Sequence, residues 1–546
     1  MPSKKFVLLA EHIQQHKHYA NNRAMAKRKR EVVDARNPAK ALKSGKEGAA
    51  STPKRTVRTE SPAHRSKETA VNGQATTGAE SKATAGSISN DANDTTTVQI
   101  ITGSYERVLH GFTAAIPHSL VTGKDDTAEE DRPKIEFSDT FLFNAHISAI
   151  RCLALTPPTE ESSKVILASG STDERINLYT LSTAPPAPSK SKPKLPSLHG
   201  ASVSENSKNK ELGALLHHAS SVTALYFPSR SKLLSSSEDS TITITRTRDW
   251  AALSTIKAPI PKVQGRPSGD TAAPGEVPAG VNDFAVHPSN KLMVSVSKGE
   301  KCMRLWNLIT GKKAGVFNFS RDILASVGEG RFGSGEGRKI VWDAASAEEL
   351  AVAFERSVVI FSIDIKPKAK ILPTPRTKIH QVRYLDGHPG ILLVSTEDGR
   401  IMAYDTNSAT APAGDGDKED DIPQSNLIAA IGGPAAGFSG RVKDFEILQL
   451  SGSTFLIISG SSDGTVRLWK LDAGELKASG EADKDQGFAA AKQVGKLLGT
   501  YTTGTRITCL KAFVMTGTPG AEEDEDEDED VPAEKDGDES SGESSE

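Results

Sequence analysis

The sequence contains few of the residue types that define several common protein classes. Only 5% of its 546 residues are aromatic and 36% are hydrophobic, so the part that can form a buried core is shorter than the whole chain. The three cysteines, Cys152, Cys302 and Cys509, are far apart and show no CxxC spacing, which argues against a disulfide framework or a zinc site and favours a reducing compartment inside the cell. No hydrophobic run reaches the roughly 18 residues of a membrane span, and the start of the chain does not read as a signal peptide.

Charge is distributed unevenly along the chain. Residues 1–70 carry 17 Lys or Arg against 6 Asp or Glu, whereas residues 521–546 carry one Lys against 15 acids. The first 96 residues also contain almost no aromatic side chains, so they cannot bury enough surface to offset the entropy of ordering. We therefore expect a disordered basic arm (1–96), a folded middle (97–515) and a disordered acidic tail (516–546).

Two stretches in the middle of the chain resemble each other. SGSSDGTVRLWK (459–470) and ASGSTDERINLYT (168–180) each place an Asp six residues before an aromatic residue, with alternating apolar residues between them. Alternation of apolar and polar residues after a Ser/Asp/Gly turn is typical of a β-hairpin, and recurring hairpins indicate a repeat architecture. The Asp and aromatic residues of these two copies and of three weaker ones are Asp173 and Tyr179, Asp463 and Trp469, Asp239, Trp306, and Asp398 and Tyr404.

A further strand precedes most of these hairpins, and in two of them a histidine, His146 or His218, stands four residues ahead of it. A His, two strands, an Asp turn and an aromatic residue are the pattern of WD40 repeats, which the chain resembles. In that family the His, Ser, Asp and aromatic residues form hydrogen-bonded chains that lock each blade of a β-propeller, so the resemblance implies that these ten residues are structural. The complete units are expected to begin near residues 148, 222, 281, 321, 379 and 441.

A seventh unit is expected to be split between the two ends of the folded region. Residues 506–514 would supply one strand and residues 98–115 the next two, and their pairing would remove the sheet edges that an open ring exposes. The expected fold is therefore all-β, a seven-bladed WD40 propeller closed by N- and C-terminal strands. Its long insertions, which cost little between strands, are predicted at residues 184–211, 260–280, 406–425 and 472–490.

Motifs that could carry chemistry are few. GEGRFGSGEGRK (328–339) contains a GxGxxG pattern, but a phosphate-binding loop follows a strand and opens a helix, whereas the sequel here reads as strand, turn and strand, so we expect a flexible hairpin loop. His12, His16 and His18 could share a helical turn, yet they lie in the arm without the fixed surroundings that a metal site needs. No Ser-His-Asp or paired-carboxylate site is evident, so we expect no catalysis, no cofactor and no metal.

The two charged ends carry separate hypotheses. Lys27, Arg28, Lys29 and Arg30 form a short basic run that we interpret as a nuclear import signal and RNA contact, with a solvated charge run as the alternative. The acidic tail is interpreted as a nucleic-acid mimic that attracts basic proteins, with a solubilising end as the alternative. Ser540 precedes an acidic residue by three positions, as in sites of acid-directed kinases, and is a candidate phosphorylation site.

Several stretches resemble one particular family among the WD40 proteins. ITGSYERVLHGF (101–112), VNDFAVHPSNKLMVSVSK (281–298), RLWNLITGKKAG (304–315) and GRVKDF (440–445) resemble the nucleolar WD40 proteins called PAK-interacting proteins in some lineages and maintenance-of-killer proteins in others. Members of that family act in assembly of the large ribosomal subunit, and some are described as negative regulators of p21-activated kinase. The resemblance implies a non-catalytic scaffold in the nucleus and nucleolus, monomeric within a large complex, with pre-ribosomal proteins and ribosomal RNA as candidate partners and no membrane association.

Two other functions fit the sequence less well. A signalling adaptor that binds and negatively regulates a p21-activated kinase would not need the polybasic arm. A substrate receptor of a cullin ubiquitin ligase usually has an Arg three residues after a blade Trp, where this chain has Ile309 and Asp472. The leading hypothesis is therefore assembly of the large ribosomal subunit and maturation of ribosomal RNA, with the kinase adaptor as the alternative.

Overall fold

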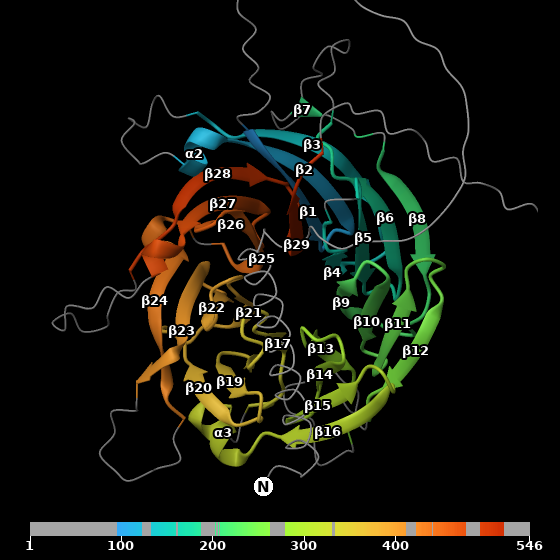
Figure 1. Cartoon of the computed structure of the whole chain (residues 1–546), viewed down its shortest axis with the longest axis vertical. Coiled ribbons are helices and arrows are strands. Elements are labelled where there is room, and N and C mark those ends of the chain that lie inside the picture. Colours follow the sequence, from blue (N-terminus) through green and yellow to red (C-terminus); the bar gives the residue numbers. More distant parts are fainter. Residues whose placement is uncertain are drawn as a thin grey trace, which may run out of the picture. The chain divides into compact units, whose positions relative to one another are not determined.

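Short antiparallel strands make up most of the structure, a computed structural model (Figure 1). Lys27 to Arg30, Ser540, and the three arm histidines His12, His16 and His18 lie outside the described residues. In the part of the chain that is described, no helix is long and apolar enough to cross a membrane. The described residues are 95–122, 133–159, 162–186, 202–203, 206, 208–261, 279–329, 333–410, 422–438, 440–476 and 492–517.

Four of the sheets have strands in simple sequence order or nearly so. The first contains β4 (Ile150–Leu155), β5 (Lys164–Ser171), β6 (Ile176–Ser182) and β8 (Lys210–Leu215). The second contains β9 (Val222–Ser229), β10 (Lys232–Ser237), β11 (Thr241–Arg246) and β12 (Ala252–Lys257). The third contains β13 (Val281–Val286), β14 (Leu292–Ser297), β15 (Cys302–Asn307) and β16 (Lys312–Asn318). The fourth contains β25 (Val442–Ser451), β26 (Thr454–Ser461), β27 (Thr465–Asp472) and β28 (Lys496–Thr502).

An eight-stranded sheet contains two halves of the same kind. One half consists of β17 (Lys339–Trp342), β18 (Glu349–Ala353), β19 (Val358–Ser362) and β20 (Pro367–Ile371). The other consists of β21 (Ile379–Tyr384), β22 (Ile391–Thr396), β23 (Arg400–Thr410) and β24 (Gln424–Gly432). A single parallel pairing, Lys370 with Gln424, joins the outer strands of the halves, so each half is equivalent to one of the four-stranded sheets.

The remaining sheet closes the ring with both ends of the folded region. It contains β29 (Ile507–Val514), β1 (Thr95–Ser104), β2 (Val108–Pro117), β3 (Glu136–Asn144) and the short β7 (Ser202–Val203). Strand β29 pairs antiparallel with β1, from Val98 opposite Val514 to Gly103 opposite Cys509. The predicted closure by N- and C-terminal strands is therefore confirmed.

The first strand of each sheet or half, in the order β29, β4, β9, β13, β17, β21 and β25, faces a central channel (Figure 1). The hydrophobic core lies between neighbouring sheets and not inside any one of them. For example, Val98 and Phe112 of the closing sheet pack with Leu456 and Val466 of the sheet that contains β25. Each sheet packs its two faces against the two neighbouring sheets, so the apolar residues of its strands are buried between sheets around the whole ring.

One expected unit boundary is wrong. A strand was expected to begin near residue 321, but Arg321–Ser326 is a short helix, α3, whose first turn is capped by Ser320, which accepts a hydrogen bond from the Ile323 amide at 3.2 Å. Ile323 and Leu324 of α3 are buried, which explains why the segment has strand-like hydrophobicity. The inner strand β17 of this unit begins later, at Lys339.

Three predicted insertions are partly regular structure, and one of them, 472–490, begins with the last residue of β27 and a 3-10 turn, η4 (Ala473–Leu476). The segment 406–425 overlaps β23, which continues to Thr410, and β24, which begins at Gln424. The segment 184–211 overlaps β7 and β8. Within the described residues the other helical elements are short, namely α2 (His118–Thr122) and the 3-10 turns η3 (Pro434–Ala436) and η4.

Candidate functional site

Of the seven inner strands that the described residues form, six contain a β-bulge one residue after they begin. A bulge sets two consecutive residues opposite a single residue of the neighbouring strand and changes the direction of a side chain. Both residues of each bulge therefore line the channel. These pairs are Arg151 and Cys152, Thr223 and Ala224, Asn282 and Asp283, His380 and Gln381, Lys443 and Asp444, and Thr508 and Cys509.

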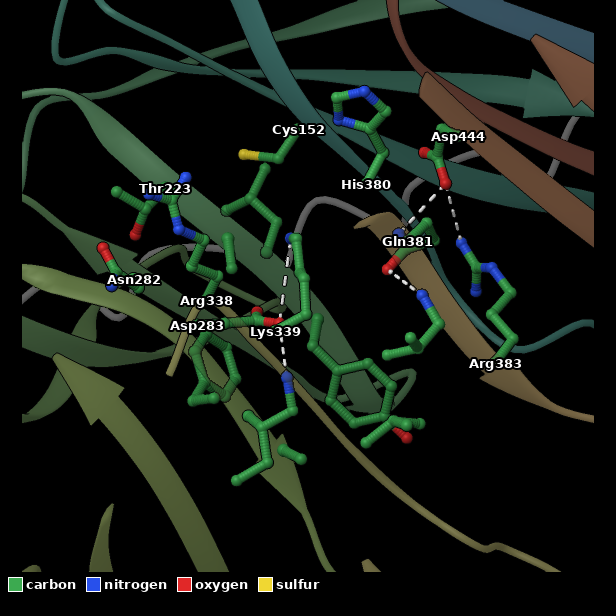
Figure 2. A pocket seen from close by; sticks show the side chains of 18 of the residues that line it. Cys152, Thr223, Asn282, Asp283, Arg338, Lys339, His380, Gln381, Arg383 and Asp444 are labelled. Carbon is green, nitrogen blue, oxygen red and sulfur yellow. Dashed lines mark hydrogen bonds and ion pairs between the residues drawn. The ribbon is translucent and has the colours of Figure 1, made fainter. Parts of the chain in front are cut away.

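The bulges lie at the end of the channel where the inner strands begin, which we call the rim. The turns between the second and third strands of each sheet lie at the same end, as the hydrogen bond from the Tyr105 amide to the Arg506 carbonyl shows. The channel has a volume of about 1720 Å³ and is open to solvent. Figure 2 shows the polar side chains that converge there, among them Lys339, His380 and Asp444.

Two carboxylates of the bulges connect inner strands to one another. Asp283 accepts a hydrogen bond from the Ile340 amide of the next inner strand at 3.1 Å, and burial raises its pKa. Asp444 accepts from the Leu510 amide of the closing strand at 2.9 Å and from Gln381 Nε2 at 3.0 Å (Figure 2). These carboxylates are therefore clamps between neighbouring sheets.

Uncharged bulge residues make similar connections. Thr223 Oγ1 donates to the Val281 carbonyl at 2.7 Å, and Thr508 Oγ1 donates to the Ile150 carbonyl at 2.6 Å. Asn282 Nδ2 donates to a carbonyl beside β17 at 2.9 Å. Because their polar atoms are already used to hold the ring, these residues are poor candidates for catalysis.

Most cations at the rim are paired with a glutamate from a neighbouring turn. Arg151 lies 2.9 Å from Glu238, Arg441 lies 3.3 Å from Glu397, and Arg338 lies 3.4 Å from Glu355. Lys378 lies 3.7 Å from the same Glu355, and Lys339 lies 3.7 Å from Asp283.

Lys443 differs from these cations. Its Nζ donates to His380 Nε2 at 3.3 Å, and among the described residues it forms no ion pair with a carboxylate. Burial lowers the pKa of Lys443, and the charges of Arg441 and Arg506 lower it further. Burial, together with Lys443 and Lys378, lowers the pKa of His380 to about 3, so this imidazole is neutral near pH 7 and can accept the hydrogen bond. The rim therefore has excess positive charge at Lys443.

The structure brings together the predicted blade-locking residues of two units. His146 lies 2.8 Å from Ser169 Oγ through Nε2 and 3.1 Å from Asp173 through Nδ1, and burial lowers the pKa of this histidine. His218 makes the equivalent contacts, 2.7 Å to Ser235 Oγ and 3.2 Å to Asp239. Tyr179 is buried on β6 of the sheet that begins just after His146. Each His thus links the loop before an inner strand to the second strand and to the turn that follows that strand.

The expected chain is incomplete around Trp306, Trp469 and Asp463. Trp306 Nε1 donates to Ser295 Oγ at 2.8 Å and Trp469 Nε1 to Ser459 Oγ at 3.3 Å, but no histidine joins either pair within the described residues. Asp463 instead accepts from the Thr465 amide at 2.9 Å. The physical reason near β25 is Phe438, which stands four residues ahead of the strand as His146 does ahead of β4, and whose ring packs edge-on against Trp469 at 5.5 Å.

Asp398 and Tyr404 do not form the expected lock either. Asp398 lies 2.8 Å from Arg400 Nε, and the Tyr404 hydroxyl contacts Met402 Sδ at 3.7 Å. Pro375 occupies the position four residues before β21 where a histidine would stand, so the Asp pairs with an arginine of its own turn. Both residues remain in the scaffold, since Tyr404 is only 2% exposed.

One polar cluster is absent from the sequence prediction. His110 Nε2 of β2 lies 2.7 Å from Asp139 of β3, and the Tyr501 hydroxyl of β28 donates to the same carboxylate. The cluster joins the closing sheet to its neighbour. The repeated pattern of an Asp six residues before an aromatic residue could not reveal this cluster. Asp139 lies on the fourth strand of its sheet, and Tyr501 lies about 360 residues away from it in the sequence.

The glycine-rich stretch does not form a nucleotide-binding loop. Gly328 follows α3, and β17 begins at Lys339, so the order is helix, glycines, strand, the reverse of a phosphate-binding loop. The expected hairpin is also wrong, because the segment joins a helix to a strand. Among the described residues no group of His, Cys, Asp and Glu could hold a metal ion, and the three cysteines are free thiols.

Comparisons with known proteins agree with this architecture. The model of the family described as WD domain, G-beta repeat matches residues 209–245 and 438–470. Protein MAK11 from Saccharomyces cerevisiae is 28% identical over 400 residues, which cover 70% of this chain and 79% of the yeast protein. A p21-activated protein kinase-interacting protein 1-like protein from Xenopus laevis is 23% identical over 426 residues, which cover 78% of this chain and 85% of the frog protein.

A ring of four-stranded sheets with Ser–His–Asp and Ser–Trp contacts, whose channel residues are used to hold the ring together, defines a WD40-repeat protein that is a non-catalytic scaffold. Over 70% or more of its length, the chain is similar in sequence to Protein MAK11 and to a p21-activated protein kinase-interacting protein 1-like protein, which are relatives with the same repeat pattern.

Proposed function

We propose that this protein is a scaffold in assembly of the large ribosomal subunit and maturation of ribosomal RNA, and that it acts in the nucleolus. The observation that carries the proposal is its family, because the resemblance seen in stretches such as residues 304–315 implies this role. The basic run Lys27–Arg30 supports it, since nuclear import and contact with RNA both require clustered positive charge.

The channel supports a binding role over a chemical one. Thr223, Thr508 and Asp444 connect inner strands, so their polar atoms are unavailable to a substrate. His380 is neutral and its Nε2 already accepts a hydrogen bond from Lys443, so this ring nitrogen is not free to take a proton from a substrate. The rim can therefore bind a charged group without transforming it.

A second candidate role comes from the relatives. The name of the Xenopus laevis protein states that it interacts with a p21-activated protein kinase. For this chain, such an adaptor role would leave the net charge of +11 in residues 1–70 without a purpose. We therefore retain kinase binding as the alternative.

Depletion of the protein in its own cells tests the proposal. We expect the ratio of large to small ribosomal subunits in a sucrose gradient to fall, and re-expression of the wild-type chain to restore it. A variant with Lys27–Arg30 changed to Ala serves as the matched test of the arm and should restore the ratio only in part. An unchanged subunit ratio after depletion would contradict the proposal.

A further inference from the structure

We propose that the rim binds an acidic segment of a partner protein, with a carboxylate of that segment paired to Lys443. The inference rests on the proposed scaffold role and names the kind of partner that the scaffold docks. It starts from the lysine at the bulge of β25, which is half-buried in the channel and is held by a neutral imidazole.

The surroundings of Lys443 favour an anion. Arg441, Lys378 and Arg506 all act on it as like charges, and Glu397, whose charge acts in the opposite sense, is already paired with Arg441 at 3.3 Å. Bringing like charges together in a partly buried site costs stability, and an incoming carboxylate would remove that cost. The rim is thus preorganised for a negative group.

The position of the charge favours a polypeptide over a nucleic acid. The exposed cations Arg151 and Arg441 are paired with glutamates, so a phosphate backbone lying across the rim would meet those glutamates as well. Lys443 lines the channel, where a single Asp or Glu side chain can reach it. Ile147, which is 70% exposed and begins the loop before β4, offers an aliphatic contact that suits a peptide.

The course of the closing strand favours a partner over the protein's own acidic tail. Strand β29 leaves the rim just after Arg506 and ends at Val514, at the other end of the channel. The chain then continues to Gly517, whose amide donates to the Thr183 carbonyl at 3.2 Å. The described part of the chain therefore ends, at Gly517, on the side away from Lys443.

The test uses a fluorescent peptide of nine glutamates, a peptide of nine glutamines, and the purified full-length protein. Because the basic arm also attracts the acidic peptide, contact is mapped by carbodiimide coupling, which joins a carboxylate to a nearby lysine, followed by mass spectrometry. The variants are Lys443→Gln and, as matched control, Lys312→Gln on the exposed outer strand β16. A chain that ends at residue 517 tests whether the protein's own acidic tail occupies the rim. A competing RNA oligonucleotide tests whether nucleic acid binds there.

We expect coupling of the glutamate peptide at Lys443, and affinity about tenfold weaker in Lys443→Gln but unchanged in Lys312→Gln. The melting temperature of Lys443→Gln should be equal to or above that of the wild type, because the change relieves repulsion, and a merely structural lysine would not behave so. The proposal would be overturned if Lys443→Gln and Lys312→Gln bound the glutamate peptide equally well. It would also be overturned if Lys443→Gln lost binding to RNA but not to the peptide, or if the chain ending at residue 517 bound the peptide much more tightly than the full-length protein. The assay uses purified protein, so its failure leaves the role in ribosome assembly to be judged by the depletion experiment.

Discussion

Removal of the Asp444 carboxylate should loosen the strand that closes the ring. Asp444→Ala leaves the Leu510 amide, which lies 2.9 Å from this carboxylate, without its acceptor inside the protein. It also removes the acceptor for Gln381 Nε2 at 3.0 Å and one of the carboxylates beside Arg383, at 3.4 Å. A buried donor left unpaired costs about 1–3 kcal/mol, and breaking a buried ion pair about 3–5 kcal/mol. Since Arg383 keeps Glu446 at 3.4 Å, we expect a total loss of about 3–5 kcal/mol.

Urea denaturation measures this loss, and amide hydrogen exchange locates it. We expect faster exchange in residues 507–514 of Asp444→Ala, because the clamp acts on that strand. Asp364→Ala, at an exposed turn between β19 and β20, is the matched control and should change the free energy of unfolding by less than about 0.5 kcal/mol. A change below about 1 kcal/mol in Asp444→Ala, together with unaltered exchange of β29, would refute the assignment of this carboxylate as a clamp.

Two further predictions come from the structure and a third from the sequence of the arm. Trp469→Ala should cost about 3–5 kcal/mol in urea denaturation, because the ring is buried and packs against Phe438, and a loss below about 1 kcal/mol would contradict a scaffold role. His380→Gln should reduce the loss of melting temperature between pH 7 and pH 4. The reason is that the folded-state pKa of about 3 lies below that of the unfolded chain, so the stability contributed by this residue is complete above the unfolded value and is lost as pH falls. If the melting temperature fell equally in the wild type and in His380→Gln, His380 would not be held neutral in the folded protein. Changing Lys27–Arg30 to Ala should leave the melting temperature unchanged and flatten the slope of log affinity for RNA against log salt by roughly 3, and an unaltered slope would leave the run as a solvated segment.

The sequence predicted what depends on local pattern. Alternating apolar residues after an Asp turn located the strands, and the contacts of His146 and His218 with Asp173 and Asp239 lie where the repeat placed them. The closing pair of strands was predictable because each was apolar on alternate positions and had no neighbour in sequence. Helix α3 was not predictable from this pattern, because Ile323 and Leu324 are as apolar as the residues of a strand; the local sign of a helix there is Ser320, a residue type that caps helices.

The channel site depends on pairing between distant strands, which the sequence shows only indirectly. A bulge is defined by the partner strand, so nothing local to Lys443 indicates that it shares the channel with Asp444 and His380. One usable signal was present, since Asp283 and Asp444 both occupy the third position of a V-x-D-F sequence at residues 281–284 and 442–445. That repetition predicts equivalent places in two inner strands, and both carboxylates do clamp the next one.

The most direct test of the central claim is to purify the tagged protein from cells and to identify the RNA and proteins that come with it. We expect precursors of large-subunit ribosomal RNA and large-subunit proteins to be enriched over their small-subunit counterparts. The Lys27–Arg30 variant provides the control for the arm and should recover less precursor RNA. Recovery of a p21-activated kinase without any ribosomal precursor would contradict the account and favour the adaptor role.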